Sequence, residues 1–142
     1  MSDLRSKTFA GWPKRVGKLQ LVKVSDIERE GVRLAAYDFD SQPGIRLRMH
    51  VFHKADLAKG APVHLQVLND NQVEDIASQL KFVAKHPGVY VAISPRGIGP
   101  TRLTQNQKHL TQTRRRFMLL GQTIAGQQVF ANQRLSKTQM VQ

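Results

Sequence analysis

Cysteine is absent from the 142-residue sequence, and several kinds of chemistry are absent with it. Without cysteine the chain forms no disulfide, holds no thiolate-bound metal and has no cysteine nucleophile, which is typical of proteins in reducing compartments. Long apolar runs are also missing. The N-terminal residues lack the apolar segment of a secretory signal, and nowhere do about 18 apolar residues follow one another, as a membrane-spanning helix requires. We therefore expect a soluble, cytoplasmic protein with no membrane partner.

Acidic residues are confined to the first half of the chain. Residues 1–75 contain all ten aspartates and glutamates together with twelve lysines and arginines, whereas residues 76–142 contain ten basic residues and no acid. The net charge of +12 is therefore divided into +2 and +10. The second half has no carboxylate that could serve as a metal ligand, as the acid of a catalytic triad or as one member of an acid–base pair.

Alternation of polar and apolar residues predicts strands with one buried face over much of the first half. The segments with this pattern are Lys18–Val24, Val32–Phe39, Ile45–His53 and Pro62–Leu68. Pro43-Gly44 separates the second segment from the third and is a turn signal, so we expect these two strands to form an antiparallel hairpin.

The pattern changes to helical spacing at Gln72–Lys85, where apolar residues recur at intervals of three and four. Val89–Ile93 then forms an uninterrupted apolar segment, as expected for a strand covered on both faces. Strand, helix and strand in this order predict a βαβ unit with parallel strands. A second helix is expected at Thr113–Leu135, after a polar loop at Thr101–Gln112.

These elements predict an α/β fold in a single domain, because a chain of this length supports one modest hydrophobic core. We expect the domain at residues 18–135, a poorly ordered N-terminal segment at residues 1–17 and a frayed tail at residues 136–142.

The turn after the buried strand, Pro95–Pro100, contains an Arg-Gly-x-Gly sequence. Glycines after a parallel strand can bring N–H groups to a phosphate, but that fingerprint is G-x-G-x-x-G running into a helix, and Pro100 removes one N–H here. We favour a structural turn. Gly97 and Gly99 are expected at positive φ or in close contacts, and Arg96 is expected to bind backbone carbonyls or a carboxylate, Asp70 being the nearest by topology.

Two further sets of residues could bind ligands. Arg114, Arg115 and Arg116 are candidates for anion binding, although on a helix they point about 100° apart and form no flat surface. The five histidines have no metal-binding spacing such as H-E-x-x-H, and His50 and His53, three apart in a strand, point to opposite faces. We expect no metal site and no cofactor.

The G-x-S-x-G elbow that carries the nucleophilic serine of many hydrolases is missing: none of the seven serines has glycine two residues away on both sides. Nevertheless, Tyr90–Thr101 (YVAISPRGIGPT), followed by Arg114–Thr123 (RRRFMLLGQT) and Gly126–Phe130, resembles bacterial α/β-hydrolases of the acetyl xylan esterase-like group. The segments Ala36–Phe39 and Pro43–Arg48 are similar to the antiparallel strands that open the catalytic domain of these hydrolases.

The resemblance implies a partial α/β-hydrolase sheet in which antiparallel strands precede parallel strands with flanking helices. It makes Val63–Leu68 the third strand, and it places the loop Asn69-Asp70-Asn71 beside the oxyanion hole. Members of the group continue into a strand that carries the nucleophile, so we expect a truncated esterase-like chain with no catalysis of its own. Full-length members are frequently secreted, whereas no signal segment is found here.

Two kinds of partner follow from this interpretation. An apolar edge strand, left exposed where a fifth strand would pair, is expected to associate with another copy or with a complementary C-terminal hydrolase half. The alternative function is a small basic module that binds nucleic acid or another polyanion through the acid-free half of the chain.

Overall fold

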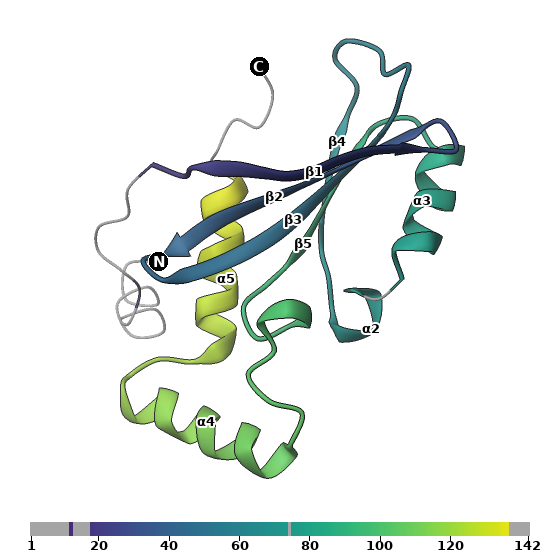
Figure 1. Ribbon diagram of the computed structural model, residues 1–142. Helices are drawn as coiled ribbons and strands as arrows, with labels where there is room; N and C mark the ends of the chain where they lie inside the picture. The colour runs from purple at the N-terminus through teal and green to yellow at the C-terminus, as the bar shows by residue number, and fades with distance from the viewer. Residues whose placement is uncertain (1–11, 13–17, 74, 137–142) are drawn as a thin grey trace.

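The computed structural model describes Trp12, residues 18–73 and residues 75–136. In these residues four strands come first, two short helices and a fifth strand follow, and further helices come last (Figure 1). In order they are β1 (Leu21–Arg29), β2 (Val32–Gln42), β3 (Ile45–Lys54), β4 (Val63–Val67), α2 (Asp70–Val73), α3 (Ile76–Lys85), β5 (Val89–Ser94), a 3-10 turn (Gly99–Thr101), α4 (Gln107–Leu119) and α5 (Ile124–Ser136).

The strands form one mixed sheet in the order β1-β2-β3-β5-β4. The pairs β1–β2, β2–β3 and β3–β5 are antiparallel, and β4 pairs with β5 in parallel through the α2–α3 crossover. The predicted hairpin is confirmed: β2 and β3 pair antiparallel, with one register shift between Asp40 and Gln42, and Gly44 in their turn has φ +75°. The predicted parallel pair of the βαβ unit is confirmed as well.

Helices cover both faces of the sheet, which gives three layers (Figure 1). One buried cluster lies on the α5 side and contains Phe39, Leu47, Met49, Val91, Ile93 and Ala131. The other lies on the α3 side and contains Val32, Leu34, Phe52, Leu68, Val83 and Ala92. Neighbouring residues of β5 enter opposite clusters, and this explains why that strand is apolar without interruption.

The edge strands differ from expectation in their burial. All nine residues of β1 are exposed, so the prediction of a half-buried strand there is wrong. The strand pairs only with β2, and the main helix contacts are made by α3 with β2 and β3 and by α5 with β2. At the opposite edge, Val63, Leu65 and Val67 of β4 remain 43, 42 and 45% exposed. The sheet therefore has an apolar edge at β4.

The predicted helix at Gln72–Lys85 is two helices, α2 and α3. Asp75 lies between them, and its carboxylate accepts a hydrogen bond of 3.1 Å from the backbone N–H of Ser78. An aspartate in this role satisfies N–H groups that have no partner inside a helix, so it favours a new start over continuation.

The predicted helix at Thr113–Leu135 is also two helices, and the first begins earlier than expected. Asn106 caps α4, because its side-chain oxygen accepts bonds from the N–H groups of Lys108 at 2.9 Å and His109 at 3.3 Å. Gly121, at φ +67°, then ends the helical path before α5. Half of the expected polar loop is therefore helical, and Figure 1 shows α4 beyond the end of α5, away from the sheet.

The ends of the chain are described only in part. Residues 1–11, 13–17 and 137–142, to which the expected N-terminal segment and tail mostly belong, lie outside the described residues. Trp12 is an exception: its indole N–H donates to the carbonyl of Gly126 at 2.9 Å, and its ring lies 5.4 Å from that of Phe130. Within the described residues no helix has the length and apolar character needed to cross a membrane.

Candidate functional site

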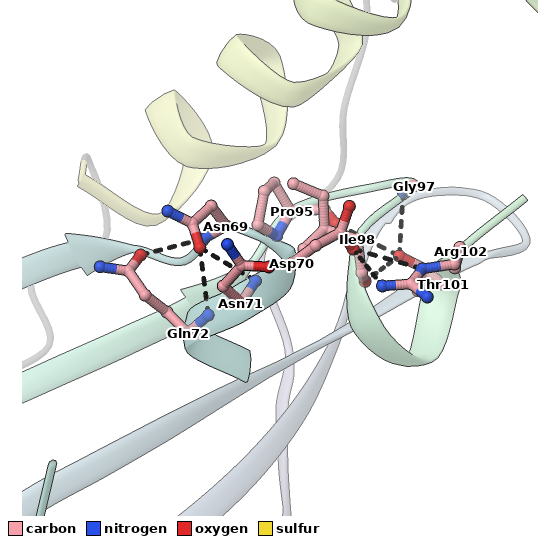
Figure 2. A network of polar contacts seen from close by, with 9 residues as sticks. All are labelled: Asn69, Asp70, Asn71, Gln72, Pro95, Gly97, Ile98, Thr101 and Arg102. Carbon is pink, nitrogen blue, oxygen red and sulfur yellow. Dashed lines mark hydrogen bonds and ion pairs between the residues drawn. The ribbon is translucent and has the colours of Figure 1, made fainter. Parts of the chain in front are cut away.

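The candidate site lies where the parallel strands β4 and β5 end. Here the segment Asn69–Gln72, which the sequence predicted as a loop but which is mostly the short helix α2, faces the turn at Pro95–Arg102, and Figure 2 shows their polar contacts. The carboxyl ends of parallel strands are the usual position of ligand and catalytic groups in α/β sheets, because the loops that follow the strands meet there.

The loop after β4 is held by its own side chains. The side-chain oxygen of Asn69 accepts hydrogen bonds of 3.1 Å from the N–H groups of Asn71 and Gln72. In return, the N–H of Asn69 donates to the side-chain oxygen of Gln72 at 3.1 Å. Three backbone N–H groups near the expected oxyanion loop are thus already bound to side-chain oxygens of Asn69 and Gln72. An oxyanion would have to displace those side-chain oxygens before it could bind the N–H groups.

An ion pair joins this loop to the turn after β5. Arg102 donates to Oδ1 of Asp70 from Nη2 at 2.8 Å and from Nε at 3.3 Å. The hydrogen bond from Arg102, assisted by its charge and by the N–H of Gly99, holds the pKa of Asp70 below its usual value. The carboxylate is therefore ionised and acts as a fixed acceptor between the two loops.

The expected pairing of Arg96 with Asp70 is wrong. The guanidinium of Arg96 lies over the ring of Phe117, 5.3 Å from its centre, and the Arg96 carbonyl accepts a bond of 2.9 Å from Gln128. Arg96 lies at the start of the turn and its contacts are with α4 and α5, whereas Arg102 lies at the end of the turn and binds Asp70. Sequence reasoning missed Arg102, since only the path of the turn distinguishes the two arginines.

Both glycines of the turn adopt a left-handed conformation, with φ +83° at Gly97 and +56° at Gly99. A Cβ at Gly97 would lie 3.8 Å from Ile124, an ordinary contact, so the backbone angle rather than crowding favours glycine there. The hydroxyl of Thr101 accepts from the N–H of Gly97 at 3.0 Å and lies 3.2 Å from the carbonyl of Pro95. These polar groups of the turn therefore form hydrogen bonds with one another.

The three candidate arginines do not face one surface. Arg114 lines a groove between α4 and α5, while Arg116 lines a separate pocket formed by α4 and the loop before it. Arg115 lines neither of them. No ion pair within the described part of the chain includes any of the three.

The histidines are dispersed over the sheet and helices. His64 stacks on Tyr90 with ring centres 4.7 Å apart, and His86 stacks on Phe82 at 4.1 Å. Burial lowers the pKa of His50, which favours the neutral ring. Among the described residues no three histidine or acidic side chains gather as a metal site would require.

Three aspartates are expected to make the fold sensitive to acid. Asp26 accepts two bonds of 2.7 Å from Arg33, Asp38 accepts bonds of 2.7 and 3.0 Å from Arg48, and Asp70 binds Arg102. Hydrogen bonds from these arginines lower the pKa of all three carboxyl groups. A carboxyl group whose pKa is lower in the folded state stabilises the fold above its unfolded pKa and ceases to do so as the pH falls.

The free energy of unfolding is therefore expected to decrease as the pH falls from about 5, and to go on decreasing below the unfolded aspartate pKa of about 3.9, because the folded-state pKa of each of the three groups is lower still. Urea unfolding at several pH values measures it. Asp26→Asn should reduce the slope, whereas Asp56→Asn, the same change outside these three pairs, should leave the slope nearly unaltered. An unaltered slope in Asp26→Asn would contradict the role of this pair.

Together, the five-stranded mixed sheet and the helices on its two faces define an α/β fold. The chain is similar to the crystal structure of a Bacteroides fragilis protein that is provisionally described as an acetyl xylan esterase, with a TM-score of 0.71 and 15% sequence identity. The match covers 95% of this chain and 40% of that protein. No protein-family model matches the sequence, and no curated protein matches it significantly.

Proposed function

We propose that the chain forms the N-terminal part of an acetyl xylan esterase-like α/β-hydrolase, a carboxylic-ester hydrolase, and that it has no catalysis of its own. The observation that carries the proposal is the parallel β4–β5 pair with the Asn69–Gln72 loop at its end. The structural similarity over 95% of the chain supports the same assignment. The chain spans 40% of the length of that neighbour, so the activity of a whole esterase is part of the proposal.

In this function the loop Asn69–Asn71 supplies the oxyanion side of an ester-hydrolysing site. Hydrolysis also requires a serine nucleophile, a histidine that takes its proton, and an acid that orients the histidine. The G-x-S-x-G elbow is missing from the 142 residues, and no acid follows Asp75. We therefore assign the nucleophile, histidine and acid to a complementary hydrolase half that pairs with the exposed β4 edge.

The internal bonds of the loop give a reason for inactivity that is independent of the missing triad. An oxyanion hole needs N–H donors that are aimed at the reacting oxygen and free to bind it. In this structure the N–H groups of Asn71 and Gln72 bind Asn69 instead. Binding of the complementary half would have to turn the Asn69 side chain away before these donors could act.

We expect the protein to hydrolyse p-nitrophenyl acetate no faster than an equal concentration of its urea-unfolded form, in which the same five histidines are present. A fluorophosphonate probe should leave the intact mass unchanged, because no serine is activated by a histidine base. Stoichiometric labelling of one serine, located by peptide mass spectrometry, would contradict the proposed inactivity.

A second measurement tests the esterase assignment itself. The DNA that follows codon 142 is expected to encode, in the same frame or another, a strand ending in a G-x-S-x-G elbow. If the genomic neighbourhood encodes no such elbow, the proposal of a complementary hydrolase half fails. The similarity in fold would then stand without an esterase function.

A further inference from the structure

A pocket of about 390 Å³ lies between α4 and the loop that follows the 3-10 turn. Its volume is within the range of small-molecule sites. The lining residues are Leu103, Thr104, His109, Gln112, Thr113 and Arg116. The last four are spaced as i, i+3, i+4 and i+7, so they form a single face of α4. This polar face is directed at the loop rather than at the sheet.

The lining offers hydrogen-bond donors and positive charge. The hydroxyl oxygen of Thr104 accepts a bond of 3.1 Å from the N–H of Asn106, which leaves its own proton for another acceptor. Asn106 also caps α4, so one residue fixes both the loop and the helix that carries Arg116. Gln112 and His109 add further side-chain donors.

The segments that form the pocket contain no carboxylate that would compete for these donors. Residues 76–142 contain no aspartate or glutamate, and Asp70, which contacts the end of the turn before the pocket, is bound by Arg102. A basic side chain with neutral donors and no carboxylate neighbour favours an anion with several oxygen atoms.

We propose that this pocket binds a small phosphorylated molecule of the phosphomonoester type. The phosphoryl oxygens bind Arg116 and the donors of Thr104 and Gln112, and Leu103 contacts the organic part of the ligand. The site is independent of the esterase assignment, because it uses none of the groups at Asn69–Gln72. It differs from a nucleic-acid surface because Arg114 and Arg115 lie outside it.

The test is a calorimetric titration of the full chain with phenyl phosphate and, separately, with inorganic phosphate. Phenyl phosphate should bind more tightly than inorganic phosphate, since only the former has an organic part. Arg116→Ala should weaken binding of phenyl phosphate about tenfold, as expected for the loss of a charge-assisted hydrogen bond. The neighbouring Arg115→Ala removes the same charge outside the pocket and should change affinity less than about twofold.

Several outcomes would overturn the proposal. One is that neither phosphate probe binds. Another is that Arg115→Ala and Arg116→Ala lose affinity for phenyl phosphate equally, and a third is that neither variant loses affinity. Tighter binding of a single-stranded oligonucleotide, with a salt dependence reduced equally by removal of each arginine, would indicate a polyanion-binding surface in place of a pocket. Urea unfolding of each variant separates a lost contact from a lost fold, and Thr104→Val provides a second variant that keeps every charge.

Discussion

Gly88→Ala is expected to lower the free energy of unfolding by about 3 kcal/mol, combining backbone strain with the loss of a hydrogen bond. Gly88 is buried between α3 and β5 and has φ +131°, a conformation that side chains rarely adopt. A Cβ there would lie 3.0 Å from the carbonyl oxygen of Pro62. That oxygen accepts the N–H of Val89 at 2.9 Å, so moving it disrupts the bond that aligns the starts of β4 and β5.

The matched control for Gly88→Ala is Gly31→Ala. Gly31 has φ +74°, but a Cβ at this position meets nothing within 4 Å, so its substitution adds strain without a collision. We expect a cost of about 1 kcal/mol there, near the lower end of the range for such backbone strain. Equal costs at the two positions, measured by urea unfolding, would show that the contact with Pro62 is unimportant.

The hairpin and the parallel strand pair could be predicted because their strands carry local signals that packing reinforces. Val89–Ile93 is apolar throughout, and its residues enter clusters on both faces of the sheet. Pro43-Gly44 specifies a turn, and the turn sets the register of β2 against β3. At β1 the alternating pattern predicted a half-buried strand, but all nine residues of the strand are exposed. Whether a strand is buried depends on the helices that pack on it, and the residue pattern of the strand alone does not show where those helices lie.

The predicted helix boundaries were wrong for a different reason. The apolar stripe continues across Asp75 and across Gly121, so periodicity alone predicts longer helices than those present. Asp75 and Asn106 are the residue types that begin helices, and greater weight on them would have located the starts of α3 and α4. The early start of α4 matters for the proposed phosphate pocket, because it places His109 and Gln112 on the same face as Arg116.

The candidate site was predictable in position but not in its contacts. The segment Asn69–Asn71 follows β4, as the resemblance implied, but Asp70 and Asn71 begin the helix α2, and the N–H of Asn69 binds the side chain of Gln72 in the same helix. Likewise, the link between the two loops comes from Arg102 rather than Arg96. Both arginines flank the same pair of glycines, which have left-handed backbone angles, and only Arg102 is bound to Asp70.

Phe52→Ala is expected to have the largest effect on stability, a loss of about 3–5 kcal/mol. Phe52 is 1% exposed and packs with Val83 of α3 and Leu34 of β2, so its ring joins the helix to the centre of the sheet. Truncation removes this apolar surface from the core and leaves a cavity beside the pocket of about 370 Å³ that Phe52 already lines under α3. The free energy of unfolding from urea denaturation measures the loss.

Phe82→Ala makes the same chemical change on the same side of the sheet, at a ring that is 50% exposed and stacked on His86. Its cost should be about 1–1.5 kcal/mol, because about half of a side-chain burial worth roughly 2–3 kcal/mol is lost. If Phe52→Ala shows no cooperative transition, Phe52→Leu, which retains most of the apolar volume, should still unfold cooperatively with a smaller loss. A cost for Phe52→Ala no greater than that for Phe82→Ala would mean that α3 is not held to the sheet through this ring. The parallel β4–β5 pair, and with it the position of the Asn69 loop, would then depend mainly on backbone bonds such as the one between Val89 and Pro62.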